Sequence, residues 1–166
     1  MIGSVHYIDC SEQGGGIVAI DESREIWQDI AGRYFGGDVY AMIEKYYETE
    51  AQVCDRTGAD IIGHFDLITK YNKGGEGGQQ GALFDEGHPR YIAAWQKAAD
   101  KLLEAGVPFE INTGGMSRGY RTDAYPAKPI RDYIAARGGR FILSSDSHNT
   151  ETLCSRFDFL LPQIPR

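Results

Sequence analysis

Short apolar runs alternate along this chain with longer segments whose apolar residues recur every three or four positions. The short runs contain β-branched and aromatic residues and predict strands at 2–8, 60–64, 108–112 and 140–145. The longer segments predict amphipathic helices, which are 38–58, 88–106 and 129–138. Strands that alternate with helices are typical of parallel sheets with crossover helices. The pattern therefore predicts one α/β domain over residues 1–166.

The predicted helix boundaries carry residue types that start or stop a helix. Asp38 can cap the first helix, and Pro89 can begin the second. Gly58 and Gly106 stand where these helices should end, because glycine accepts the left-handed conformation that closes a helix. The first strand begins at residue 2 with no lead-in. We therefore expect the chain to start inside a domain and to form part of a barrel.

Composition and charge exclude several classes of function. The net charge of -7 and the lack of a Lys and Arg cluster argue against a nucleic-acid partner. The apolar runs are too short to span a membrane, and the amino terminus lacks the features of a signal peptide. The cysteines Cys10, Cys54 and Cys154 form no Cys-x-x-Cys pair, so neither disulfides nor a thiolate zinc site are expected. These features favour a reduced, cytoplasmic location.

Three glycine-rich segments follow predicted strands, at 14–16, 73–81 and 114–119. Loops at the carboxyl ends of parallel strands often build active sites, although plain surface loops have the same composition. None of these segments has the Gly-Lys-Ser/Thr ending or the Gly-x-Gly-x-x-Gly pattern of a phosphate loop. The sequence therefore does not indicate nucleotide binding through those motifs.

Candidate metal ligands lie at the ends of three predicted strands. Asp146 and His148 follow the last strand, and alternation along a strand would turn both side chains to one side. His6 and His64 end two earlier apolar runs, whereas His88 precedes Pro89 and fits a helix cap. Each histidine alone is more often structural. Together they form a nitrogen and oxygen ligand set that suits zinc, manganese or iron and a metal-bound hydroxide.

Further polar residues lie at the same predicted end of the sheet. Asp66, Glu110 and Asn112 could hold the ligands in place through hydrogen bonds, although Asp66 could equally cap a helix. Arg118 and Arg121, in a glycine-flanked loop, have the forked donors that suit phosphate oxygens. Solvated surface arginines would have the same pattern.

Four segments resemble the polymerase-and-histidinol-phosphatase (PHP) family, most closely its histidinol-phosphatase branch. They are Ile2 to Tyr7, Ile61 to Asp66, Phe109 to Thr113 and Ser144 to His148. The resemblance extends over nearly the whole chain. It implies a distorted α/β barrel with a divalent metal cluster, and a metal-dependent phosphomonoesterase that hydrolyses L-histidinol phosphate in histidine biosynthesis. It also implies metal binding by His6, His64, Asp146 and His148, with Asp146 and His148 in catalytic roles.

The resemblance covers the carboxyl-terminal portion of the family pattern, because the initial His-x-His strand and a bridging glutamate have no counterpart here. The expected fold is therefore a partial (βα) barrel that lacks its amino-terminal strands, with weak or absent activity in the isolated chain. Three alternatives stay open: a non-catalytic half-barrel that binds metal or phosphate and is completed by a partner chain or by a second copy, another PHP-type phosphoesterase, and an amidohydrolase.

Overall fold

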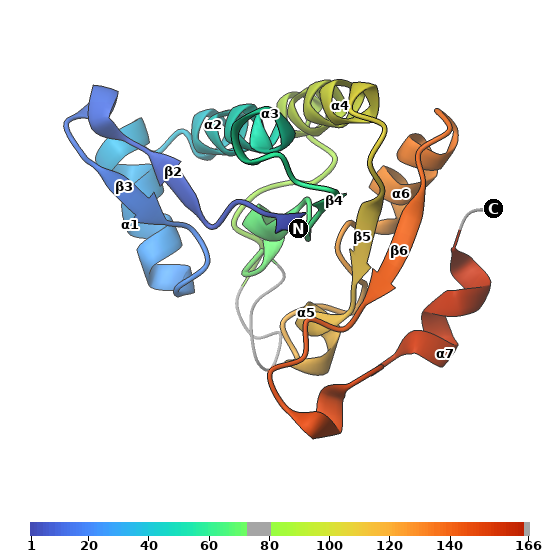
Figure 1. Ribbon diagram of the computed structural model, residues 1–166. Coiled ribbons are helices and arrows are strands. Elements are labelled where there is room, and N and C mark those ends of the chain that lie inside the picture. The colour runs from blue at the N-terminus through green and yellow to red at the C-terminus, as the bar shows by residue number, and fades with distance from the viewer. Residues whose placement is uncertain (73–80, 165–166) are drawn as a thin grey trace.

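The computed structural model describes residues 1–72 and 81–164, and its central element is a parallel sheet of four strands (Figure 1). The strand order is β1-β4-β5-β6. The bounds are β1 (Ile2–Gly3), β4 (Ile61–Ile62), β5 (Phe109–Asn112) and β6 (Phe141–Ser144). The predicted α/β class with parallel strands is confirmed. The glycine-rich segment 73–81 lies, apart from residue 81, outside the described residues.

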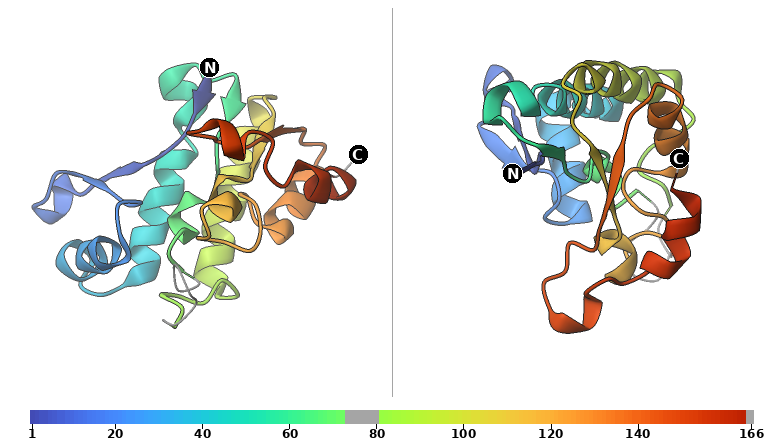
Figure 2. Two further views of the ribbon diagram at one scale, coloured as in Figure 1. Left: turned by 90° about the horizontal axis from the view of Figure 1, so that it is seen from below. Right: turned by 45° about the vertical axis from the view of Figure 1, so that its right-hand side comes forward.

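Three of the helices that follow or precede these strands pack side by side. They are α2 (Val39–Glu50), α4 (Pro89–Glu104) and α6 (Lys128–Ala135), and α3 (Val53–Thr57) follows α2 after a short break. Figure 2 shows α4 between α2 and α6. The predicted caps are confirmed, because the Asp38 carboxylate accepts from the backbone N–H groups of Tyr40 and Ala41, and Gly106 has a φ of 68°.

A second unit, absent from the sequence prediction, lies beside the sheet. It contains β2 (Tyr7–Asp9), β3 (Ile17–Ala19) and α1 (Arg24–Phe35), and β2 pairs with β3 in antiparallel fashion (Figure 1). The prediction of one continuous strand over 2–8 is therefore wrong. The chain leaves the parallel sheet after Gly3, and Ile8 is buried in the core while its neighbours on β2 are exposed. Alternating burial of this kind suits a ribbon with one covered face.

Short elements complete the described fold. They are the helices α5 (Gly114–Ser117) and α7 (Phe157–Leu160) and the 3-10 turns η1 (Ser11–Gln13), η2 (Leu67–Thr69), η3 (Thr150–Thr152) and η4 (Leu161–Gln163). No helix in the described ranges has the length and apolar character needed to cross a bilayer.

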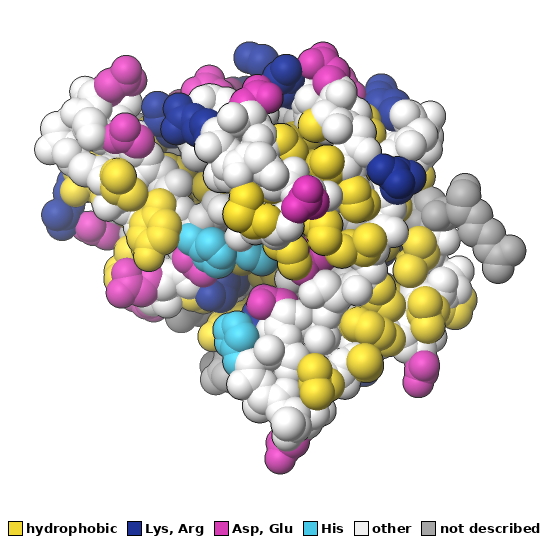
Figure 3. Space-filling model, in the orientation of Figure 1, with side chains coloured by type: hydrophobic (Ala, Val, Ile, Leu, Met, Phe, Trp, Pro, Cys, Tyr) yellow, Lys and Arg dark blue, Asp and Glu magenta, His cyan; other side chains and the backbone are white. Residues whose placement is uncertain are grey.

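Aromatic side chains fill much of the core between the sheet and the helices. Tyr47 lies against Phe65, and Phe65 lies against Phe109 with ring centroids 5.7 Å apart. The opposite side is less covered, since β6 is half-buried along its whole length and Ile2 on β1 is 50% exposed. Figure 3 shows hydrophobic side chains gathered on this face of the molecule.

A buried acid in α2 predicts a pH-dependent stability. Glu50 is fully buried, and neither carboxylate oxygen has a hydrogen-bond partner within the described residues. The nearby Tyr46 hydroxyl donates to the carbonyl of Phe65 instead, at 3.1 Å. Burial, reinforced by the charge of Asp66, raises the pKa of Glu50 well above its ordinary value, so the folded protein holds a proton that the unfolded chain releases.

We expect Glu50→Gln to stabilise the protein increasingly as the pH rises. The contribution of Glu50 to the free energy of unfolding is greatest below the pKa that Glu50 has in the unfolded chain. As the pH rises from there toward the pKa of Glu50 in the folded protein, this contribution falls by up to about 1.4 kcal/mol per pH unit. Urea unfolding between about pH 5 and about pH 8 should show a widening gap between variant and parent. Exposed Glu48, changed to Gln, is the control. Parallel stability curves for Glu50→Gln and the parent would contradict the expectation.

Candidate active site

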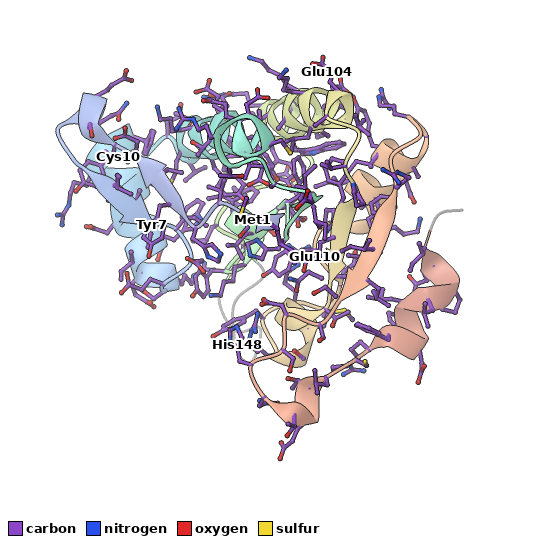
Figure 4. All side chains as sticks on the ribbon, viewed as in Figure 1. Met1, Tyr7, Cys10, Glu104, Glu110 and His148 are labelled. Carbon is purple, nitrogen blue, oxygen red and sulfur yellow. The ribbon has the colours of Figure 1, made fainter. Side chains whose placement is uncertain are left out.

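A cavity of about 550 Å³ lies at the carboxyl ends of the parallel strands. Figure 3 shows histidine side chains beside acidic and basic ones at a hollow in this face, and Figure 4 shows Glu110 on β5 and His148 in the loop after β6. The structure brings all four predicted metal ligands to this cavity. Its titratable lining residues are His6, Asp21, His64, Lys70, Glu110, Arg118, Tyr120, Tyr125, Asp146 and His148.

His6 and His64 form the closest pair of imidazoles in the cavity. Their ring centroids are 4.8 Å apart, with the rings nearly perpendicular. His64 is only 8% exposed, and its Nδ1 has no hydrogen-bond partner among the described residues. Burial, followed by the charge of His6, lowers the pKa of His64. A neutral imidazole is thereby favoured, which is the form that binds a metal ion.

Glu110 and Asn112 hold the segment that carries His64. The Oε2 of Glu110 accepts from the His64 backbone N–H at 2.8 Å and from the Asn112 side-chain amide at 3.0 Å. Asn112 Oδ1 then accepts from the Gly114 N–H at 2.7 Å. These contacts join β4, β5 and the start of α5. Glu110 thus contacts the backbone N–H of His64, and His64 Nδ1 forms no hydrogen bond with it within the described residues.

Asp146 meets Arg118 at the edge of the cavity. Arg118 Nη2 donates to Asp146 Oδ2 at 2.8 Å, and Arg118 Nη1 donates to the Asp146 carbonyl at 3.1 Å. Burial alone would raise the pKa of Asp146, but the hydrogen bond and charge of Arg118 outweigh it and hold that pKa below its ordinary value. A Cβ at Gly114 would come within 2.6 Å of Arg118 Nη2, so glycine allows this close approach.

His148 faces Asp146, but the reason differs from the one the sequence suggested. β6 ends at Ser144, and Asp146 has a φ of 46°, so strand alternation does not extend through the motif. Aspartate tolerates this left-handed conformation better than most residues do. The resulting turn leaves His148 Nε2 3.6 Å from Asp146 Oδ1, with the imidazole 77% exposed.

Two charged cavity residues, Asp21 and Lys70, were absent from the sequence prediction. Asp21 Oδ2 lies 3.1 Å from His6 Nδ1, and Lys70 Nζ donates to the Asp21 carbonyl at 2.7 Å. Asp21 follows the apolar run Ile17 to Ile20, which is the same strand-end signal that identified the histidines. Lys70 follows a 3-10 turn after β4, and a lone lysine in such a position gives no signal in the sequence.

Asp66 and Arg121 are placed away from the cavity lining. Both side chains are buried, and Arg121 Nη1 lies 3.5 Å from Asp66 Oδ2 and donates to the Thr69 hydroxyl. Asp66 also accepts from the backbone N–H of Ala127 at 3.0 Å. The two arginines expected to act together are therefore separated, because Arg118 reaches the cavity whereas Arg121 forms an internal ion pair.

No protein-family profile matches the chain. The chain is similar to two proteins named probable histidinol-phosphatase. One is from Schizosaccharomyces pombe, with 27% identity over 89% of this chain and 44% of the relative. The other is from Deinococcus radiodurans, with 31% identity over 99% of this chain and 53% of the relative. The chain thus spans about half the length of the curated relatives it matches.

The fold is also found in a solved structure. The crystal structure of hisK from Listeria monocytogenes, a candidate histidinol phosphatase, aligns with a TM-score of 0.74 and 19% identity. The alignment covers 95% of this chain and 56% of hisK. This likeness shows a common fold.

The imidazole pair provides a test of whether the cavity suits a divalent metal. The unpartnered Nδ1 of buried His64 lacks an interaction that a metal ion would supply. Within residues 1–72 and 81–164, no three His, Cys, Asp or Glu side chains converge closely enough to hold an ion by themselves. The two imidazoles therefore fit an ion, and Asp146 and His148 line the same cavity without forming a three-ligand group with them in this arrangement.

Proposed function

We propose that this chain carries a metal-dependent phosphomonoesterase site of the PHP type that acts on L-histidinol phosphate. The observation that carries the proposal is the placement of two cationic side chains, Lys70 and Arg118, in the same cavity as the imidazole pair His6 and His64. A phosphate monoester has anionic oxygens that need such donors. The names of the two relatives support the substrate.

The metal would be held by His6 and His64, with Asp146 and His148 as further ligands or catalytic groups. When bound, a divalent ion of zinc, manganese or iron would supply a nucleophilic hydroxide and neutralise phosphate oxygens. Glu110 keeps the His64 backbone in place, and Arg118 holds Asp146. His148 is exposed at the rim, where a side chain can exchange a proton with a departing alkoxide.

Lys70 and Arg118 favour a phosphate monoester over the neutral amide of an amidohydrolase. Arg118 presents a planar fork of donors, and Lys70 presents a compact charge beside the ring of Tyr120, 5.0 Å from its centroid. Burial, opposed by the nearby Asp21 carboxylate, lowers the pKa of Lys70. A partly desolvated ammonium binds an anion more strongly than a solvated one does.

Slow release of phosphate from L-histidinol phosphate, dependent on Mn²⁺ or Zn²⁺, is the expected activity of the chain. Turnover should be low because the described ligands do not by themselves complete a metal site. Lys70→Met and Arg118→Met should each raise KM by about 10- to 100-fold, the effect of one charged hydrogen bond. His148→Ala should abolish release, and His88→Ala is the matched control. Release that survives His148→Ala, or that needs no metal, would contradict the proposal.

A second candidate is a non-catalytic half-barrel completed by another chain or a second copy. The observation in its favour is that β1 and β6 are the outer strands of the parallel sheet, with Ile2 on β1 half exposed. Size-exclusion chromatography with metal analysis distinguishes the phosphomonoesterase from the non-catalytic half-barrel. A dimer that binds metal and releases no phosphate would favour the half-barrel.

A further inference from the structure

Asp21 contacts both functional groups that the proposed site depends on. Its carboxylate Oδ2 lies 3.1 Å from His6 Nδ1, and its backbone carbonyl accepts from Lys70 Nζ at 2.7 Å and from the Tyr71 hydroxyl at 2.8 Å. The His6 carbonyl in turn accepts from the Ile20 N–H at 2.9 Å, so the backbones of the two segments are fixed against each other. The contact between Asp21 and His6 is therefore built into the fold.

The contact with the Asp21 carboxylate determines which nitrogen of His6 carries the proton. An ionised carboxylate can only accept a hydrogen bond, so the neighbouring Nδ1 must donate. In a neutral imidazole the other nitrogen, Nε2, then keeps its lone pair.

We propose that Asp21 is a positioning residue that holds His6 as the Nδ1–H tautomer and so presents the Nε2 lone pair to a divalent metal ion. The role rests on the proposed function, since a metal ion is what the lone pair would bind. Carboxylates that hold a metal-binding histidine in this way raise metal affinity by orienting the ring and increasing its basicity. The Lys70 ammonium is held mainly by the Asp21 backbone, because the carboxylate Oδ2 is farther from Nζ, at 3.8 Å.

This difference between side chain and backbone predicts a separation of two binding affinities. Asp21→Ala removes the partner of His6 but keeps the carbonyl that holds Lys70. We expect Mn²⁺ affinity to fall by roughly 10- to 100-fold. Affinity for inorganic phosphate in the metal-free protein should stay within about twofold or increase, because a carboxylate near the ammonium is lost. Titration calorimetry measures both. Loss of both affinities together would show a merely structural role and overturn the proposal.

The tautomer of His6 can be read directly in the metal-free chain. Long-range ¹H–¹⁵N spectra, recorded above the titration range of histidine, should show His6 as the Nδ1–H form in the parent and as mainly Nε2–H in Asp21→Ala. Asp21→Asn keeps an acceptor oxygen and should retain part of the Nδ1–H form. Glu22→Ala, an exposed neighbour, is the control and should leave the spectrum unchanged.

The outcomes separate this inference from the proposed function. An Nε2–H tautomer in the parent, or an Nδ1–H tautomer unaffected by Asp21→Ala, would overturn the positioning role whatever the activity. Absence of metal-dependent phosphate release, together with the expected tautomer change, would reject the phosphatase and leave the positioning role supported.

Discussion

Arg121→Met should lower the free energy of unfolding by about 3–5 kcal/mol, the cost of breaking a buried ion pair from one side. The Arg121 side chain is 6% exposed and that of Asp66 is fully buried, with Nη1 and Oδ2 3.5 Å apart. Removing the guanidinium leaves the Asp66 carboxylate without its compensating charge. The Thr69 hydroxyl and the ring of Tyr125, 4.5 Å from the guanidinium carbon, also lose a partner. Chemical denaturation measures the loss.

Arg118→Met is the matched control, because it removes the same group from the cavity edge. Its ion pair with Asp146 is about one-third exposed on both sides, so the change should cost no more than about 1 kcal/mol. Asp66→Asn combined with Arg121→Met should recover part of the lost stability, since no buried charge is then left unpaired. Equal stabilities of Arg118→Met and Arg121→Met would show that the internal ion pair does not stabilise the fold.

The helices flanking the sheet could be predicted from the sequence because their ends carry local signals. α4 begins at Pro89, is capped by the His88 side chain, and ends before Gly106. His88 Nδ1 accepts from the Arg90 N–H at 3.2 Å, which confirms the cap expected for this histidine. Such signals depend on a few neighbouring residues and not on the tertiary fold.

The antiparallel ribbon could not be predicted in the same way. Residues 2–8 form one apolar run, yet the chain pairs Gly3 with Ile62 in parallel and Ile8 with Val18 in antiparallel fashion. Strand propensity does not specify the partner of a strand, which is set by packing against distant segments. His6 accordingly lies between two strands of different sheets. Its contact with Asp21 is set by the tertiary fold and not by neighbouring residues in the sequence.

The two arginines show why side-chain roles were harder to predict than side-chain positions. Arg118 and Arg121 share a glycine-containing loop, and the sequence gives both the same polar context. One guanidinium reaches the cavity and the other turns inward to Asp66. Three residues of separation are enough to reverse the direction, since the loop turns at Gly119, where φ is 78°. The second cavity cation, Lys70, comes instead from the segment after β4.

His64→Ala should weaken Mn²⁺ binding by about 100-fold or more, because the His64 ring lies 4.8 Å from the ring of His6 and the two imidazoles are placed to hold an ion together. The His64 ring is buried, so the variant must be checked for a native circular dichroism spectrum and a cooperative unfolding transition. Its backbone N–H, which donates to Glu110, is retained in the alanine variant. Mn²⁺ affinity is measured by electron paramagnetic resonance of the free ion.

The loss of Mn²⁺ affinity in each alanine variant should depend on where the replaced histidine lies. His88→Ala removes an imidazole that caps α4 and stacks on Tyr40, so it should cost about 1 kcal/mol of stability and leave Mn²⁺ affinity unchanged. His148→Ala should have an intermediate effect on affinity, because that ring is 77% exposed at the rim. Equal Mn²⁺ affinities in a folded His64→Ala variant and in His88→Ala would mean that the imidazole pair does not hold a metal, and the proposed hydrolytic chemistry would lose its basis.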